Sequence, residues 1–228
     1  MPQGQDKRRA QRKDEEQMNV KLVWVTPDAE EKVAYMARVS NPGNQDNKET
    51  APKLLRYLMR HKHWSPFEMV NVCMEIECTR DIARQIIRHR SFSFQEFSQR
   101  YADPTEALGF AFRQLRYQDK VNRQNSIASS ENDTTQGAWA TMQDNVMTEA
   151  KVNYDAALAL GIAKEQARAL LPEGLTVSRL YMAGTLRSWI HFIELRSGNG
   201  TQKEHQLIAL ACAKAIAAIF PMSESLVQ

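Results

Sequence analysis

The chain has 228 residues, of which 43% are hydrophobic and 25% are charged, a composition that excludes disorder throughout. Thirty Lys and Arg residues against 27 Asp and Glu leave a formal net charge of +3, too small to attract nucleic acid by bulk charge. A chain of this length can bury roughly 70% of the surface that it exposes when unfolded, so we expect one folded domain.

The sequence carries no signal for a membrane or for export. No window approaches 18 consecutive apolar residues, and the first residues contain no apolar signal core. The three cysteines, Cys73, Cys78 and Cys212, form no disulfide pattern, which suits a reducing compartment. We therefore expect a cytoplasmic protein whose thiols are buried and structural.

The first 18 residues differ from the rest of the chain. Residues 1–18 hold five Lys or Arg, four Asp or Glu and almost no apolar side chain, so they cannot bury enough surface to fold. We expect a disordered charged tail there and a folded domain over 19–228. A nucleic-acid-binding arm is the alternative, but the interleaved acidic residues favour a solvated tail.

The elements expected next alternate between strand and helix. Residues 20–25 predict a strand, and Thr26 is placed to cap a helix that begins at Pro27 and runs to about Val39. The apolar spacing of residues 54–59 predicts a second helix.

The spacing of apolar residues changes several times in the middle of the chain. Alternating apolar side chains over 69–78 predict a half-buried strand, after which Thr79 caps a helix that reaches Arg90. Residues 91–101 follow neither period and are interpreted as a loop, and the alternation over 110–117 predicts another strand.

The C-terminal half is expected to be mainly helical. Helices are predicted over 131–160, 163–171, 184–196 and 202–220, the last opened by a capping box at 201–204. The last helix is apolar almost all round, which indicates burial against the core or against another subunit. Strands separated by groups of helices indicate an α+β fold.

The densest polar stretch outside the tail is residues 84–101. Arg88, Arg90 and Arg100 repel one another unless an anion lies among them, and Gln85 lies three residues before Arg88 on the predicted helix. Four aromatic side chains interleave with these charges, so much of the stretch should be packed rather than solvated. The pattern predicts an anion site, with a nucleotide, RNA or single-stranded DNA as possible ligands.

Three segments resemble the flavin-dependent thymidylate synthases (the ThyX family). Arg88-His89-Arg90, followed after seven residues by Ser98, matches the RHR-x7-S motif of that family. The upstream segment 63–68 (HWSPFE) and the downstream segment 187–196 (RSWIHFIELR) match two further motifs. The resemblance covers about residues 19–220 and omits only the tail.

The resemblance implies a fold, a reaction and an assembly. The fold is a single α+β domain with a central, mostly antiparallel sheet flanked by helices, assembled as a homotetramer with shared active sites. The reaction is the reductive methylation of dUMP to dTMP, with 5,10-methylenetetrahydrofolate as carbon donor and NADPH as reductant through tightly bound FAD. Neither a metal, nor nucleic acid, nor a membrane is implied.

By position in these motifs, nine residues are expected to contact FAD: Ser65, Arg88, His89, Arg90, Glu96, Thr185, Leu186, Arg187 and His191. Arg187 and His191 are four apart, so one helix face can present both. Thr185 departs from the family pattern, because some members have Asn there.

Eleven residues are expected to contact dUMP: Gln85, Ile86, Ile87, Arg88, Glu96, Phe97, Ser98, Gln99, Arg100, Arg168 and Arg196. Ser98 and Arg100 suit a phosphate group. Arg196 is the candidate catalytic residue, since a guanidinium against the N3–O4 edge of uracil favours the N3 anion and makes C5 more nucleophilic. For the folate, His63 is the one candidate.

Rival interpretations have weaker support. A cysteine nucleophile is disfavoured, because no cysteine lies beside a His or Arg that would lower its pKa. A zinc site from His61, His63 and His89 lacks motif spacing. A nucleic-acid-binding module that uses the tail and the RHR stretch is the non-enzyme alternative, and it predicts binding that falls steeply with salt.

Overall fold

The computed structural model describes residues 19–130 and 132–220, so the tail expected over 1–18 lies outside the described residues. The elements follow in chain order as β1 (Asn19–Val25), α2 (Ala29–Ala37), η1 (Pro42–Asn44), α3 (Ala51–Arg60), η2 (Ser65–Glu68), β2 (Asn71–Thr79), α4 (Arg80–Ile86), β3 (Ser93–Glu96), α5 (Pro104–Ala107), β4 (Arg116–Gln118), β5 (Ser126–Ala128), α6 (Thr135–Ala159), α7 (Lys164–Ala167), η3 (Arg168–Leu170), β6 (Val177–Thr185), α8 (Leu186–Ser197) and α9 (Lys203–Ala217).

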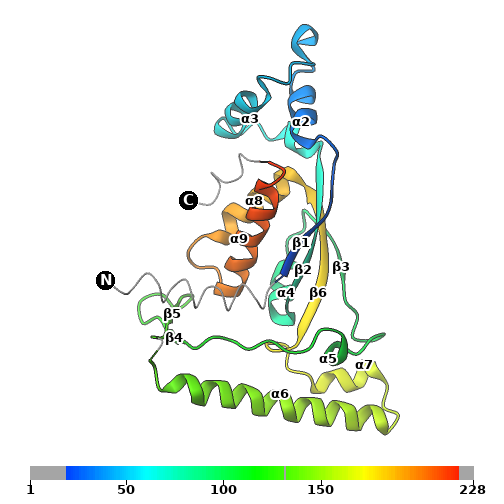
Figure 1. Ribbon diagram of the computed structural model, residues 1–228, viewed down its shortest axis with the longest axis vertical. Coiled ribbons are helices and arrows are strands. Elements are labelled where there is room, and N and C mark those ends of the chain that lie inside the picture. The colour runs from blue at the N-terminus through cyan, green and yellow to red at the C-terminus, as the bar shows by residue number, and fades with distance from the viewer. Residues whose placement is uncertain (1–18, 131, 221–228) are drawn as a thin grey trace.

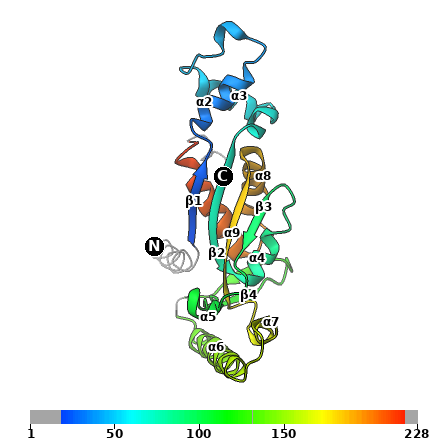
Figure 2. The same ribbon diagram turned by 90° about the vertical axis from the view of Figure 1, so that its right-hand side faces the viewer.

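A four-stranded antiparallel sheet forms the centre of the molecule, in the order β1-β2-β6-β3. Helices α8 and α9 lie against one face of the sheet, α2 and α3 lie beyond one end, and α6 crosses the other end (Figure 1). Seen from the side, the opposite face of the sheet has no helix in front of it within the described chain (Figure 2). The expected α+β domain with an antiparallel sheet is confirmed.

The strand β2 supplies the alternating pattern that builds the core. Val72, Met74, Ile76 and Cys78 are all buried in one cluster with apolar residues of α8 and α9. The apolar helix α9 packs against its own chain, through β1, α4 and α8. The sequence left two possibilities for this helix, burial against the core or against another subunit. In the structure it is buried against the core of its own chain.

The strand β6 was not expected from the sequence, although it pairs with both β2 and β3. It joins β2 over the full length of both strands, with Met74 opposite Met182. Leu180 and Met182 are buried, but Ser178 and Gly184 on the same face of the strand interrupt the apolar alternation. The pairing partners are about 100 residues apart, so no local pattern reveals them.

Four expected elements differ in the structure. The helix expected over 163–171 is divided into the short helix α7 and the 3-10 turn η3. The segment 91–101, interpreted as a loop, contains the short strand β3, whose backbone pairs with β6 while Ser93 and Gln95 stay exposed. Helix α4 ends at Ile86 rather than Arg90. Of the strand expected over 110–117, only an isolated bridge at Phe110 and the start of β4 are formed. A four-residue strand at the edge of a sheet is stabilised by its partner strand, and it is too short to show a clear alternation of apolar residues.

The expected helix caps are also partly wrong. Asp28 is the N-cap residue of α2, and the Thr26 hydroxyl instead accepts a 2.9 Å hydrogen bond from the Asn71 backbone N–H, which joins β1 to β2. Thr79 is the N-cap residue of α4 as expected, but its hydroxyl donates to Asp81. At α9 the N-cap residue is Gln202, and no side chain caps the helix.

Gly184 of β6 lies directly beneath the Phe92 ring. A Cβ at Gly184 would lie 2.5 Å from Phe92 Cδ1, and the Phe92 ring is held with its centroid 4.9 Å from that of Trp189. We expect Gly184→Ala to lower the free energy of unfolding by ~1–3 kcal/mol through overpacking. Denaturant titration measures this change.

The matched control is Gly137→Ala in α6, where an added Cβ meets nothing within 4 Å. This substitution should raise the free energy of unfolding by up to about 1 kcal/mol, because Ala is the better helix former. Equal effects of the two substitutions would contradict the packing described for Gly184.

Candidate functional site

The last turn of α8 meets the chain just after α4, at His89 and Arg196. The Arg196 Nε–H donates to His89 Nε2 over 2.9 Å, and the His89 ring lies edge-on to Phe192 with centroids 5.0 Å apart. Because Nε2 accepts this hydrogen bond, the neutral ring carries its proton on Nδ1. The two residues come from motifs more than 100 residues apart.

His89 is neutral over the physiological pH range. Burial, the Arg196 guanidinium and His191 together lower the pKa of His89 to about 4. Its neutral ring therefore orients Arg196 without cancelling the positive charge. Arg196 itself has no carboxylate partner among residues 19–130 and 132–220.

Arg88 and Arg90 flank His89 with their side chains exposed. Neither makes an ion pair with any residue that the structure describes. Arg88, Arg90 and Arg196 thus have no counter-ion from the described chain, and Arg196 contacts the neutral His89 directly. Arginines without carboxylate partners are available to an anion, and phosphate oxygens match the donors of a guanidinium. The helix face expected to carry Gln85 and Arg88 together is not formed, because α4 ends before Arg88.

A second group of expected residues lies where α8 begins. Arg187 forms an ion pair with Glu68 of η2, the segment that also contains Ser65. Thr185 is the N-cap residue of α8, and its hydroxyl accepts from the Ser188 backbone N–H over 3.3 Å. That cap occupies the Thr185 hydroxyl within the chain.

Two expected contact residues have side chains that are buried in the core. Leu186 is 1% exposed and Ile86 is fully buried. Their side chains pack in the same apolar cluster, so only their backbone groups remain for a ligand. His191, one turn beyond Arg187 on α8, is exposed.

A third group gathers around Glu165 of α7. Arg100 lies 3.5 Å from the Glu165 carboxylate, and the Arg168 Nε–H donates to the Glu165 backbone carbonyl over 3.2 Å. The Ser98 hydroxyl accepts a 3.4 Å hydrogen bond from the Arg100 backbone N–H, and Gln99 is buried. The structure therefore brings together the expected residues that suit a phosphate.

Glu96 and Phe97 belong to the strand edge between these groups. The Ser178 hydroxyl donates to the Glu96 carboxylate over 2.9 Å, and Arg80 lies 3.8 Å from it. The Phe97 backbone N–H donates to the Arg179 carbonyl. Ile87 caps the end of α4 and is half-buried.

The second and third groups lie at opposite ends of β6. Thr185 ends that strand, whereas the segment after Phe97 runs beside its first residues. A strand of nine residues spans roughly 27 Å. One chain therefore does not gather all of the expected residues around one small ligand.

Sequence reasoning missed several residues near the site. His205 lies beside Gln85 and His89, and Gln202 hydrogen-bonds to Gln85. Glu204 hydrogen-bonds to Gln202, and Glu165 lies beside Arg100. A lone histidine in an apolar helix carries no motif signal, so only the packing of α9 against α4 reveals it.

The cysteines have the environment of structural thiols. Burial raises the pKa of Cys73, and it raises the pKa of Cys78 and Cys212 further. All three are free and buried, and Cys73 and Cys78 lie on opposite faces of β2, as expected.

A metal site is not formed by the residues that the structure describes, since no three His, Cys, Asp or Glu side chains cluster suitably. His61 and His63 instead pack around Tyr57, with ring centroids 4.3 and 6.0 Å from it. Helices long and apolar enough to cross a membrane are likewise absent from 19–130 and 132–220.

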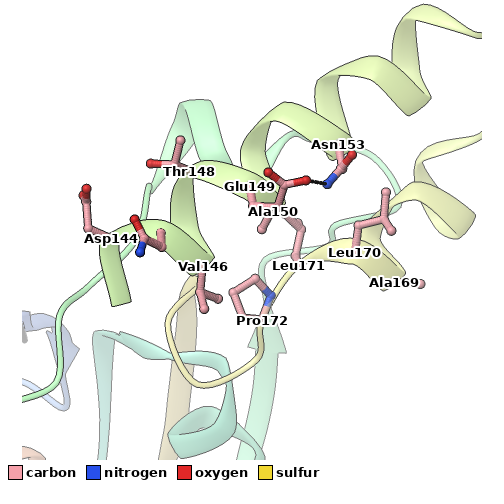
Figure 3. A pocket seen from close by; sticks show the side chains of 11 residues that line it. Asp144, Val146, Thr148, Glu149, Ala150, Asn153, Ala169, Leu170, Leu171 and Pro172 are labelled. Atoms are coloured by element: carbon pink, nitrogen blue, oxygen red, sulfur yellow. Dashed lines mark hydrogen bonds between the residues drawn. The ribbon is translucent and has the colours of Figure 1, made fainter. Parts of the chain in front are cut away.

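A groove lies between α6 and the segment after Arg168 (Figure 3). It is lined by Asp144, Asn145, Val146, Thr148, Glu149, Ala150, Asn153, Ala169, Leu170, Leu171 and Pro172. None of the residues expected at the site lines this groove, and it contains no basic side chain that would hold a phosphate.

Known proteins resemble this chain over nearly its whole length. The family model described as "Thymidylate synthase complementing protein" matches residues 21–222. A probable flavin-dependent thymidylate synthase of Paramecium bursaria Chlorella virus 1 is 49% identical over 211 residues, which cover 90% of this chain and 96% of the relative. The flavin-dependent thymidylate synthase of Synechocystis sp. is also 49% identical, over 83% of this chain and 85% of that protein.

The fold has a counterpart among solved structures. The UMP/dUMP methylase PolB from Streptomyces cacaoi, bound with 5-Br dUMP, superposes with a TM-score of 0.74 at 28% identity, covering 92% of this chain and 93% of that one. Together with the family match, this likeness confirms the resemblance drawn from the RHR-x7-S motif. The chain belongs to the family of flavin-dependent thymidylate synthases.

Proposed function

We propose that this chain converts dUMP to dTMP in the cytoplasm, with 5,10-methylenetetrahydrofolate as carbon donor and NADPH as reductant through bound FAD. The observation that carries the proposal is the hydrogen bond from Arg196 to the neutral His89 of the RHR motif, whose neighbours Arg88 and Arg90 are exposed and have no ion-pair partner in the described chain. The folded domain is proposed to begin at residue 19.

The flavin dependence of the relatives supports FAD, and the 5-Br dUMP bound to the solved neighbour supports dUMP.

The donor set fits FAD. Arg88 and Arg90 are exposed cations that can pair with the diphosphate, and His191 adds a polar group on α8. Ser65 and Arg187 would hold another part of the cofactor at the start of α8, where Thr185 offers its backbone rather than its capping hydroxyl. FAD supplies the hydride equivalent that turns the transferred methylene group into a methyl group.

The residues around Glu165 fit the phosphate of dUMP. Arg100 and Arg168 are held together by one acidic residue, and Ser98 adds a hydroxyl. A dianionic phosphate is a stronger partner for two guanidiniums than the exposed Glu165 carboxylate, so binding would replace the Arg100–Glu165 pair.

Arg196 is proposed to activate the uracil ring. Its Nε–H is committed to His89, which leaves its terminal N–H groups for the N3–O4 edge of the base. Because His89 is neutral, the full positive charge of Arg196 remains available to stabilise the N3 anion.

We propose that the active site is shared between subunits of a homotetramer. The separation of the Thr185 end of β6 from the Arg168 group supports this, because two chains can bring together what one chain keeps apart. The uncovered face of the sheet also exposes Trp24 and Tyr181, which suits an interface.

The first test is the colour and assembly of the purified protein. We expect visible flavin absorbance, dTMP formation from dUMP with methylenetetrahydrofolate and NADPH, and sedimentation at about four chain masses. A colourless protein that binds single-stranded DNA in a strongly salt-dependent way would favour the nucleic-acid-binding alternative.

The second test concerns Arg196. Arg196→Lys keeps the charge but loses the planar fork, so turnover at saturating dUMP should fall ~100-fold or more, with normal FAD content. Stopped-flow should show normal flavin reduction by NADPH and slow reoxidation with dUMP and the folate. Arg123→Lys, an exposed change in the β4–β5 connection, is the control. Normal reoxidation in Arg196→Lys would place uracil activation elsewhere.

The third test concerns the cysteines. Their raised pKa values predict that replacing Cys73, Cys78 and Cys212 together by Ala leaves dTMP formation within about tenfold, allowing for lost packing. Loss of turnover in a folded, flavin-loaded triple variant would instead indicate attack by sulfur.

A further inference from the structure

His205 lies in the first turn of α9 with no exposed surface. Its ring centroid is 5.7 Å from Phe192 and 6.2 Å from His89, the histidine that orients Arg196. Its Nδ1 is 3.3 Å from Gln85 Oε1, whereas its Nε2 is buried without a hydrogen-bond partner among the described residues.

A fixed charge sets the direction of the hydrogen bonds that reach His205. Glu204 forms ion pairs with Arg113, over 3.0 Å, and with Arg116. Burial alone would raise the pKa of Glu204, but the two guanidiniums outweigh it and hold the pKa below its ordinary value. Glu204 is therefore a carboxylate, which can only accept hydrogen bonds.

The orientation then passes through two side-chain amides. The Gln202 Nε2 group donates to Glu204 Oε2 over 3.0 Å, so Gln202 turns its oxygen toward Gln85. The Gln85 Nε2 group donates to that oxygen over 2.7 Å, so Gln85 turns its own oxygen toward His205. An amide oxygen only accepts, and His205 must donate from Nδ1.

We infer that His205 is a positioning residue of the nucleotide site, which fixes the Gln85 carboxamide through an Nδ1–H···Oε1 hydrogen bond. The inference rests on the proposed function, in which Gln85 contacts dUMP. With one lone pair and one N–H already committed, the Gln85 amide presents a single defined edge to the ligand.

The surroundings keep His205 in this form. Protonation would place a second N–H at Nε2, where no acceptor lies within the described chain, beside the cationic Arg196. Burial, followed by Arg196 and His89, accordingly lowers the pKa of His205 to about 3. A donor at Nδ1 is thus present throughout the physiological pH range.

Three substitutions of His205 separate the hydrogen bond from simple packing. The Asn amide nitrogen can take the place of Nδ1, the longer Gln places its amide beyond that point, and Leu has no donor. We expect the Kd for dUMP, followed by the change in flavin absorbance, to rise ~10-fold or more in His205→Leu and His205→Gln. His205→Asn should stay within about threefold, and FAD content should not change in any variant.

A double-mutant cycle identifies the residue through which His205 acts. In the Gln85→Leu background, His205→Leu should weaken dUMP binding no further, because the amide that it orients is gone. Ile216→Val, which removes one buried methyl group from the same helix, is the control and should leave dUMP affinity unchanged. Additive losses, or equal dUMP affinity in all three His205 variants, would overturn the inference.

The tautomer provides a readout that needs no ligand. NMR of protein labelled in histidine should show neutral His205 with its proton on Nδ1, and an Nε2–H tautomer would overturn the inference. If wild-type protein has this tautomer but binds neither flavin nor dUMP, the proposed function fails while the hydrogen-bond arrangement stands. If the wild type binds both ligands and His205 is Nε2–H, only the inference fails.

Discussion

The pairing of β2 with β6 is the interaction on which the rest of the structure depends. It joins two strands about 100 residues apart over their full length and aligns Val72, Met74 and Met182 on the face that α8 and α9 cover. In an antiparallel pair, the last residue of one strand lies opposite the first residue of the other. Thr185 therefore lies opposite Asn71, and the start of α8 lies beside the segment that contains Glu68. At its other end the same pairing sets Val177, the first residue of β6, opposite Thr79, the N-cap residue of α4.

The site combines unpaired positive charge with neutral histidines. Arg88, Arg90 and Arg196 have no acidic partners within the described chain, although nearby Arg113 and Arg116 are paired with Glu204. Arg113 and Arg116 hold α9 in place through Glu204. The arginines without an acidic partner remain available to anions. Repulsion among unpaired cations is a cost that bound phosphates would relieve.

Sequence patterns predicted the α+β class, the core face of β2 and the long helices, because each depends on residues that are neighbours in the chain or one turn apart. The cap expected at Thr26 is wrong because its hydroxyl bonds to Asn71 instead. In the capping box expected at 201–204, Glu204 pairs with Arg113 and Arg116 rather than capping the helix. The sequence did not predict β3 and β6. Each of these strands is stabilised by pairing with a strand that is distant in the sequence, β6 with β2 and β3 with β6.

The sequence by itself determined the family through the RHR-x7-S motif, and the short spacing of its arginines predicts donors for an anion. Only the tertiary structure decided how those donors are used. It set Arg196 against a neutral His89, committed the Thr185 hydroxyl to a helix cap and buried the Leu186 side chain. The physical reason is that orientation, protonation and burial depend on neighbours brought from distant segments, which no local spacing encodes.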